Sequence, residues 1–184
     1  MKKLLTSLLF ILSMSTTLLA QNNALPFYEI PESPETYTAG TVAARMIDGL
    51  GFRYFWATEG LTEADLAYKA SESGRTCGQT VDHILSLTNT IFQSVTNQKT
   101  PLKMDEMSFS EKRILTLEKL MEVREVLKES TDLTAQSKSF PFWNNINGPI
   151  GDAIWHAGQI VVLRRAAGNP IPSGVNFFSG TVKK

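Results

Sequence analysis

The chain contains two histidines, His83 and His156, and each lies in a segment whose apolar residues recur at helical spacing. Asp152 precedes His156 by four residues, which is just over one helical turn, so the two side chains would share one face of a helix. Two neutral imidazoles and one carboxylate on one side of a cleft form a facial metal site with positions left open for water or substrate. Zn, Ni, Fe or Mn would all suit these donors, and the sequence does not choose among the divalent ions.

Simpler interpretations exist for the same residues. A histidine on an apolar helix face is more often a hydrogen-bonded core residue than a ligand. Asp152 could stabilise a helix N-terminus, or it could form an ion pair with His156 worth about 0.3 kcal/mol. The metal hypothesis therefore depends on whether the fold brings His83 to the same depth as the other two residues.

Four segments are predicted to be helices and would have to position these side chains: 38–58, 76–97, 108–130 and 147–167. Two of them open with the spacing of a capping box, at Thr76 and Gln79 and at Ser108 and Glu111. No alternating strand pattern competes with the helical periods. The sequence therefore predicts an all-α fold, a four-helix bundle.

The direction of the helices decides whether the candidate ligands meet. In an up-down-up-down bundle the second and fourth helices would run parallel, and His83 would lie at the same depth as the Asp152 and His156 pair. The connections 98–107 and 133–146 are also long enough for a crossover. Antiparallel helices would then be expected to place the ligands at different depths.

Composition and charge narrow the function classes. The 184 residues include 18 basic and 18 acidic side chains and are 42% apolar, which fits one globular domain. A balanced charge offers no surplus of Lys or Arg for a phosphate backbone, so nucleic acid is not the expected partner. The single cysteine, Cys77, excludes a disulfide within the chain.

The first twenty residues have the pattern of a secretory signal peptide. Lys2 and Lys3 precede an apolar stretch over 4–12, and cleavage is predicted after Ala20. The alternative is an uncleaved N-terminal anchor. We expect an exported protein, periplasmic or secreted, with no stable membrane span after cleavage. The predicted divisions are a signal peptide over 1–20, an extended leader over 21–37 that lies over the domain or in solvent, the bundle over 38–172 and a C-terminal tail over 173–184.

Other polar residues have both a functional and a plain interpretation. Glu59 could act as a general base or be a solvated carboxylate at a helix end. Gln159 could hydrogen-bond a ligand or a neighbouring helix. Arg164 and Arg165 suit the dipole at a helix C-terminus, and Cys77 is expected to be a packing residue. Aromatic side chains before the last helix would form a lid over a pocket or plug one end of the bundle; they are Phe140, Phe142 and Trp143.

Three segments resemble the DinB/YfiT-like superfamily of small bacterial four-helix proteins, over 38–170 of the chain. They are TCGQTVDHILSL at 76–87, NGPIGDAIWHAGQIVVLR at 147–164 and WATEGLTEADLA at 56–67. In that family three histidines typically hold the metal, and by position His83 matches the first ligand and His156 the last. Asp152 stands where the middle histidine is expected. The resemblance therefore implies a site of two histidines and a carboxylate, shifted toward harder metals or vestigial.

The resemblance implies two classes of function. Some family members are thiol transferases, others are metal-dependent isomerases, and many have no known activity. Export argues against a thiol transferase, because low-molecular-weight thiols are chiefly cytosolic. The expectations are a metal-dependent transferase or hydrolase that acts on a small molecule, or a non-catalytic, stress-related module that binds a metal or ligand. Family members often pair through bundle faces, which is compatible with a homodimer.

Overall fold

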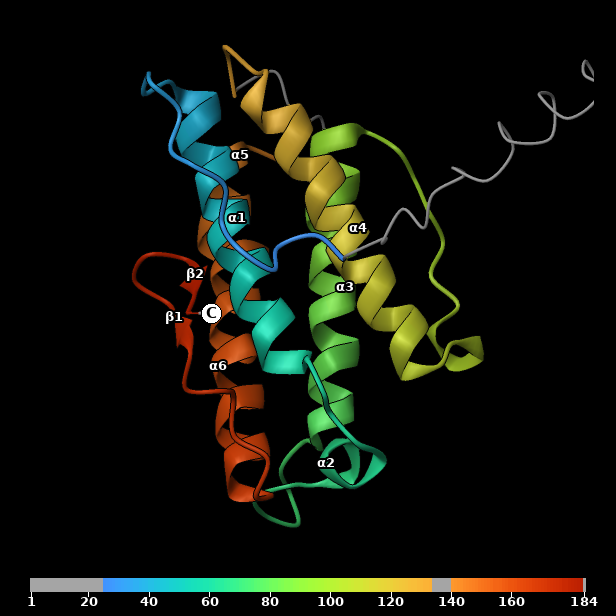
Figure 1. The fold of residues 1–184 in the computed structure, drawn as a ribbon. Coiled ribbons are helices and arrows are strands. Elements are labelled where there is room, and N and C mark those ends of the chain that lie inside the picture. Colours follow the sequence, from blue (N-terminus) through green and yellow to red (C-terminus); the bar gives the residue numbers. More distant parts are fainter. Residues whose placement is uncertain (1–24, 134–139, 184) are drawn as a thin grey trace, which may run out of the picture.

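The structure is a computed structural model that describes residues 25–133 and 140–183. Most of the described residues are helical, which confirms the all-α class predicted from the sequence (Figure 1). Within these ranges the β structure is one small antiparallel hairpin, formed by β1 (Val175–Asn176) and β2 (Thr181–Val182). The hairpin lies in the segment expected to be a C-terminal tail. The predicted signal peptide lies outside the described residues.

Among the described residues, four helices of sixteen residues or more make up the body of the molecule. They are α1 (Ala39–Thr58), α3 (Cys77–Thr96), α4 (Phe109–Lys128) and α6 (Gly151–Ala166). Both α1 and α3 pack against α4 and against α6. The capping boxes predicted at Thr76 and Ser108 are both present and begin α3 and α4. No described helix is long and apolar enough to cross a membrane.

The helices α3 and α4 run in the same direction. Near their starts, Lys112 of α4 lies 2.8 Å from the carboxylate of Asp82 on α3. Farther along both helices, the ammonium group of Lys119 lies 3.7 Å from the ring centre of Phe92. The connection between them, which contains the short 3-10 turn η1 (Met104–Glu106), therefore returns along the length of the bundle (Figure 1).

The helices α3 and α6 run antiparallel. The hydroxyl of Ser94, near the end of α3, lies 3.0 Å from the amide oxygen of Asn145, which precedes α6. Earlier in α3, His83 faces Asp152 in α6. The parallel arrangement assumed for an up-down-up-down order is therefore wrong, and the crossover between α3 and α4 is the reason.

The last long helix begins later than predicted. Regular α-helix starts at Gly151, after the short helix α5 (Phe142–Asn145) and a π-helical turn, η2 (Ile146–Ile150). Gly148 has φ −94° and ψ −106°, outside the helical region. The next residue is Pro149, whose ring disfavours helical geometry in the residue before it. The prediction that a helix starts at Asn147 is wrong. Helical residues begin earlier, at Phe142, the backbone breaks at Gly148, and regular α-helix resumes at Gly151. A further short helix, α2 (Glu63–Ala67), was not predicted.

The N-terminal leader lies against α1 where the structure describes it. The side chain of Phe27 is 4% exposed and passes over Gly51, where an added Cβ would come within 2.5 Å of the ring. The indole nitrogen of Trp56 donates to the carbonyl oxygen of Tyr28 at 3.1 Å. The backbone N–H of Ile30 donates to a carbonyl of the C-terminal segment. Of the two expectations for the leader, the structure shows the packed one at Phe27 and Ile30, whereas residues 31–37 are exposed.

The hydrophobic core lies between the four long helices. Each of them contributes side chains that are fully buried: Ile47, Leu50, Ile84, Ile91, Leu117, Leu120 and Ile160. Burial of one such side chain contributes about 2 kcal/mol. This core fixes the faces of α3 and α6 that meet at the site described next.

Candidate metal centre

The three candidate ligands lie together where α3 meets α6. Asp152 is central: its Oδ2 lies 3.5 Å from Nε2 of His83, and its Oδ1 lies 3.4 Å from Nε2 of His156. The two imidazole rings meet edge to face, with centroids 4.5 Å apart. One ligand atom from each residue can be chosen so that all three lie within 4.8 Å of one another. Side chains from two helices thus converge on a common point.

The spacing of these atoms is compatible with donors around a cation. Nitrogen and oxygen donors lie about 2.1 Å from a Zn²⁺ ion, so two of them at a tetrahedral angle are about 3.4 Å apart. A charge-assisted hydrogen bond between an imidazolium and a carboxylate would measure about 2.8 Å. The observed distances of 3.4 and 3.5 Å are near the first value, and each runs to a different oxygen of Asp152.

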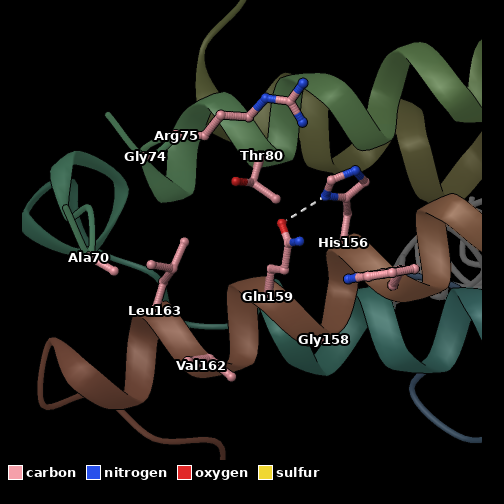
Figure 2. Close-up of a pocket in the computed structure, with 10 residues that line it drawn as sticks. Ala70, Gly74, Arg75, Thr80, His156, Gly158, Gln159, Val162 and Leu163 are labelled. Atoms are coloured by element: carbon pink, nitrogen blue, oxygen red, sulfur yellow. Dashed lines mark hydrogen bonds between the residues drawn. The ribbon is translucent and has the colours of Figure 1, made fainter. Parts of the chain in front are cut away.

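Gln159 fixes the orientation of the His156 ring. Its Oε1 lies 2.8 Å from Nδ1 of His156, as the dashed line in Figure 2 shows. Because an amide oxygen only accepts hydrogen bonds, Nδ1 is the donor in this contact, and Nε2 is the ring nitrogen that faces Asp152. Metal-bound histidines commonly have such a partner on the second ring nitrogen. The two interpretations of Gln159 were a hydrogen bond to a bound ligand and one to a neighbouring helix. The structure shows instead a hydrogen bond to His156, one of the residues expected to hold the metal.

The centre is reachable from solvent. His156 is 9% exposed, whereas the side chains of His83 and Asp152 are 30% and 44% exposed. Within the described part of the chain, Asp152 has no ion pair with a Lys or Arg side chain. Its carboxylate is therefore available to neutralise part of the charge of a cation, and the open side leaves room for a further ligand.

A groove adjoins the centre on the side of His156. Its cavity volume is about 680 Å³, and Figure 2 shows the side chains that line it. Besides His156, they come mainly from α6 and from the start of α3 and the loop before it: Ala70, Arg75, Thr80, Trp155, Gln159, Val162 and Leu163. Sequence reasoning missed Arg75 and Trp155. Trp155 could have been found from its position next to His156 in the sequence. Arg75 lies in the loop before α3, so no helical periodicity indicates it.

Glu59 does not reach the centre. Its carboxylate lies 2.6 Å from the guanidinium of Arg113, which also donates to the hydroxyl of Thr58 at 3.0 Å. The role of general base proposed for Glu59 is therefore not supported by its position. Cys77 is fully buried, and burial raises the pKa of its thiol to about 11. It is a packing residue, as expected.

Arg164 lies in the last turn of α6, where a cation suits the helix dipole as predicted, and it also makes buried contacts. It is 2% exposed and donates to the carbonyl oxygens of Trp56 and Ala57 at 2.9 and 3.1 Å. It thus joins the end of α6 to the end of α1. Of the aromatic residues before α6, Phe142 is buried and Trp143 is 73% exposed, and neither lines the groove beside the centre.

Comparison with known proteins returned no relative: no family model, curated protein or solved structure matches the chain. The functional argument therefore depends on the residues of this sequence and on the geometry described above.

Proposed function

We propose that this protein is a DinB-like four-helix bundle that binds one divalent metal ion through His83, Asp152 and His156. The observation that carries the proposal is the convergence of these side chains from two helices, with separations of 3.4 and 3.5 Å at Asp152. One ligand atom from each residue lies within 4.8 Å of the other two, so a single ion can be shared by all three.

The centre would serve a metal-dependent transferase or hydrolase that acts on a small molecule. A divalent ion held there would act as a Lewis acid toward a bound electrophile or a nucleophilic hydroxyl group. The chain itself contributes the orientation of His156 through Gln159 and an adjoining groove of about 680 Å³ for the substrate. Asp152 adds an oxygen donor, which favours harder ions such as Mn or Fe relative to an all-histidine site.

Packing of the long helices supports the four-helix class. Two helices, α1 and α3, each contact both α4 and α6, so the four surround one core. The signal-peptide pattern over 1–20 supports export, and export disfavours a reaction that consumes a cytosolic thiol.

A non-catalytic metal-binding module is the second candidate, and one observation favours it. Among the described residues that line the groove, His156 is the sole side chain suited to proton transfer near neutral pH. Glu59 is engaged by Arg113, and the raised pKa of Cys77 keeps its thiol protonated. A binding module needs no separate acid or base.

Metal analysis tests the centre. Protein purified without a polyhistidine tag should carry about one divalent ion per chain, and His156→Ala and Asp152→Asn should lose it. Asp82→Asn is the matched control, because Asp82 is a neighbouring, partly exposed carboxylate on α3 paired with Lys112. A metal content that Asp152→Asn and His156→Ala leave unchanged would contradict the proposal.

Turnover separates the two candidate functions. The metal-loaded protein would be screened against small esters, amides and thiol acceptors. Hydrolysis or transfer that disappears in His156→Ala supports the enzyme. Bound metal with no turnover of any compound supports the binding module.

A further inference from the structure

The groove beside His156 combines an apolar surface with a volume of about 680 Å³, which is large enough for a small organic molecule. Val162 and Leu163 of α6 provide much of the apolar wall. Trp155 stands at the rim with 73% of its surface exposed. An exposed indole beside an apolar wall is a surface against which a hydrocarbon chain or ring can pack.

One cationic side chain, Arg75, lines this groove, and in the part of the chain that the structure describes no Asp or Glu lines it. Arg75 is exposed, and the described residues offer its guanidinium no ion pair. Figure 2 shows its side chain extending along α3 in the direction of the His156 ring. The groove therefore presents an unpaired positive charge next to an apolar wall.

Gly158 keeps part of the groove open. It lies within α6, where glycine lowers helix stability relative to alanine. A Cβ added at Gly158 would meet no atom within 4 Å, so packing does not require glycine there. What the missing side chain leaves is space on the groove surface, between Trp155 and Val162.

We propose that this groove binds a small carboxylate with an apolar body, the carboxylate on Arg75 and the apolar part against Val162, Leu163 and Trp155. The inference rests on the proposed function, because it names the substrate class of the metal centre that shares His156 with the groove. A carboxylate suits a single guanidinium, which binds it through two parallel hydrogen bonds.

Calorimetric titration of the metal-loaded protein tests the inference with three probes of equal size: phenylbutyrate, phenylbutanamide and phenylbutylamine. Phenylbutyrate should bind about fivefold more tightly than the neutral amide, and the amine more weakly than either. Arg75→Gln should abolish this preference and leave the affinity for the amide unchanged. Arg165→Gln, the same change at an exposed arginine outside the groove, should preserve the preference.

Gly158→Leu tests the location of the site. The added side chain has open space, so the helix should form, while the groove is filled and the affinity for phenylbutyrate falls at least about tenfold. Gly158→Ala should bind nearly as well as the wild type. Equal binding of phenylbutyrate by Gly158→Leu and the wild type would place the site elsewhere and overturn the inference.

Failure of the inference is distinguishable from failure of the metal proposal. Metal-loaded protein that binds none of the probes, or binds phenylbutyrate and the amide equally, overturns the carboxylate site alone. If the purified protein carries no metal, the metal proposal is contradicted; phenylbutyrate binding that still depends on Arg75 in that protein supports the carboxylate site by itself.

Discussion

The most quantitative prediction concerns Arg164, the buried arginine that joins α6 to α1. Its guanidinium donates to the carbonyl oxygens of Trp56 and Ala57, and to the carbonyl and side-chain oxygens of Asn169 at 2.7 and 3.1 Å. Helix α1 ends at Thr58, so these two α1 carbonyls belong to its last turn, where carbonyls lack partners within the helix. Arg164 supplies the missing donors.

Arg164→Met keeps most of the volume and removes every donor. The carbonyls of Trp56 and Ala57 would then have no donor where Arg164 is now 2% exposed, and each unpaired carbonyl costs about 1–3 kcal/mol. Asp65 would also lose the positive charge that helps to hold its carboxyl pKa down. The free energy of unfolding should therefore fall by about 3–5 kcal/mol, the range found when a buried charge network loses one partner.

Urea denaturation followed by circular dichroism measures this change. Arg165→Met provides the control, because Arg165 is the exposed neighbour on the same helix and its loss should change stability by less than about 0.5 kcal/mol. If Arg164→Met unfolds within about 1 kcal/mol of the wild type, the donors of Arg164 do not stabilise the end of α1 and the reasoning is wrong.

Three further predictions follow from local geometry. Gly158→Ala should raise the free energy of unfolding by about 1 kcal/mol, because its Cβ meets no atom within 4 Å. Gly40→Ala should lower it by about 1–3 kcal/mol, because there a Cβ would come within 2.2 Å of a backbone oxygen. Thermal melts measure both changes, and a shift opposite in sign to the one given would contradict the expectation for that variant. Burial raises the pKa of Cys77 to about 11, so the native thiol should resist iodoacetamide at neutral pH and react after unfolding, as mass spectrometry would show; rapid labelling of the folded protein would refute this. Gln159→Leu removes the hydrogen bond to Nδ1 of His156 and should weaken metal binding about 10–100-fold in competition with a chelator, whereas unchanged affinity would deny that role.

The helix starts were predictable where their signals are local. Thr76 and Gln79 form a capping box within four residues of sequence, and so do Ser108 and Glu111. These hydrogen bonds join residues close in sequence, so the sequence alone indicates where both helices begin. The start of α6 was not predictable in this way. Pro149 is compatible both with a helix start and with a break inside a longer helical segment, and the segment 142–150 shows the second.

The three candidate ligands were identified from their types, their spacing and the family resemblance, but the expected geometry was wrong. His83 was expected to lie at the same depth in the bundle as Asp152 and His156 only if their helices were parallel, whereas α3 and α6 are antiparallel. Ser94 lies eleven residues after His83, and its partner Asn145 lies eleven residues before His156, so the two contacts share one antiparallel register. Connection lengths alone cannot distinguish these arrangements.

The positions of isolated charged residues were the least predictable feature of the structure. Arg75 follows no helical period, and its place in the groove depends on how the loop before α3 meets α6. Arg164 was interpreted from its position at a helix end, where a cation is favourable in any case. Its buried contacts with α1 come from residues more than a hundred positions away, which no local pattern can indicate.

Anomalous X-ray diffraction from crystals of protein purified without a polyhistidine tag, collected at the absorption edge of the metal, tests the central claim most directly. We predict one anomalous peak about 2.1 Å from Nε2 of His83, Nε2 of His156 and a carboxylate oxygen of Asp152. Crystals that show no such peak, with Asp152 hydrogen-bonded to one imidazole at about 2.8 Å, would contradict the claim and leave an ion pair in place of a metal centre.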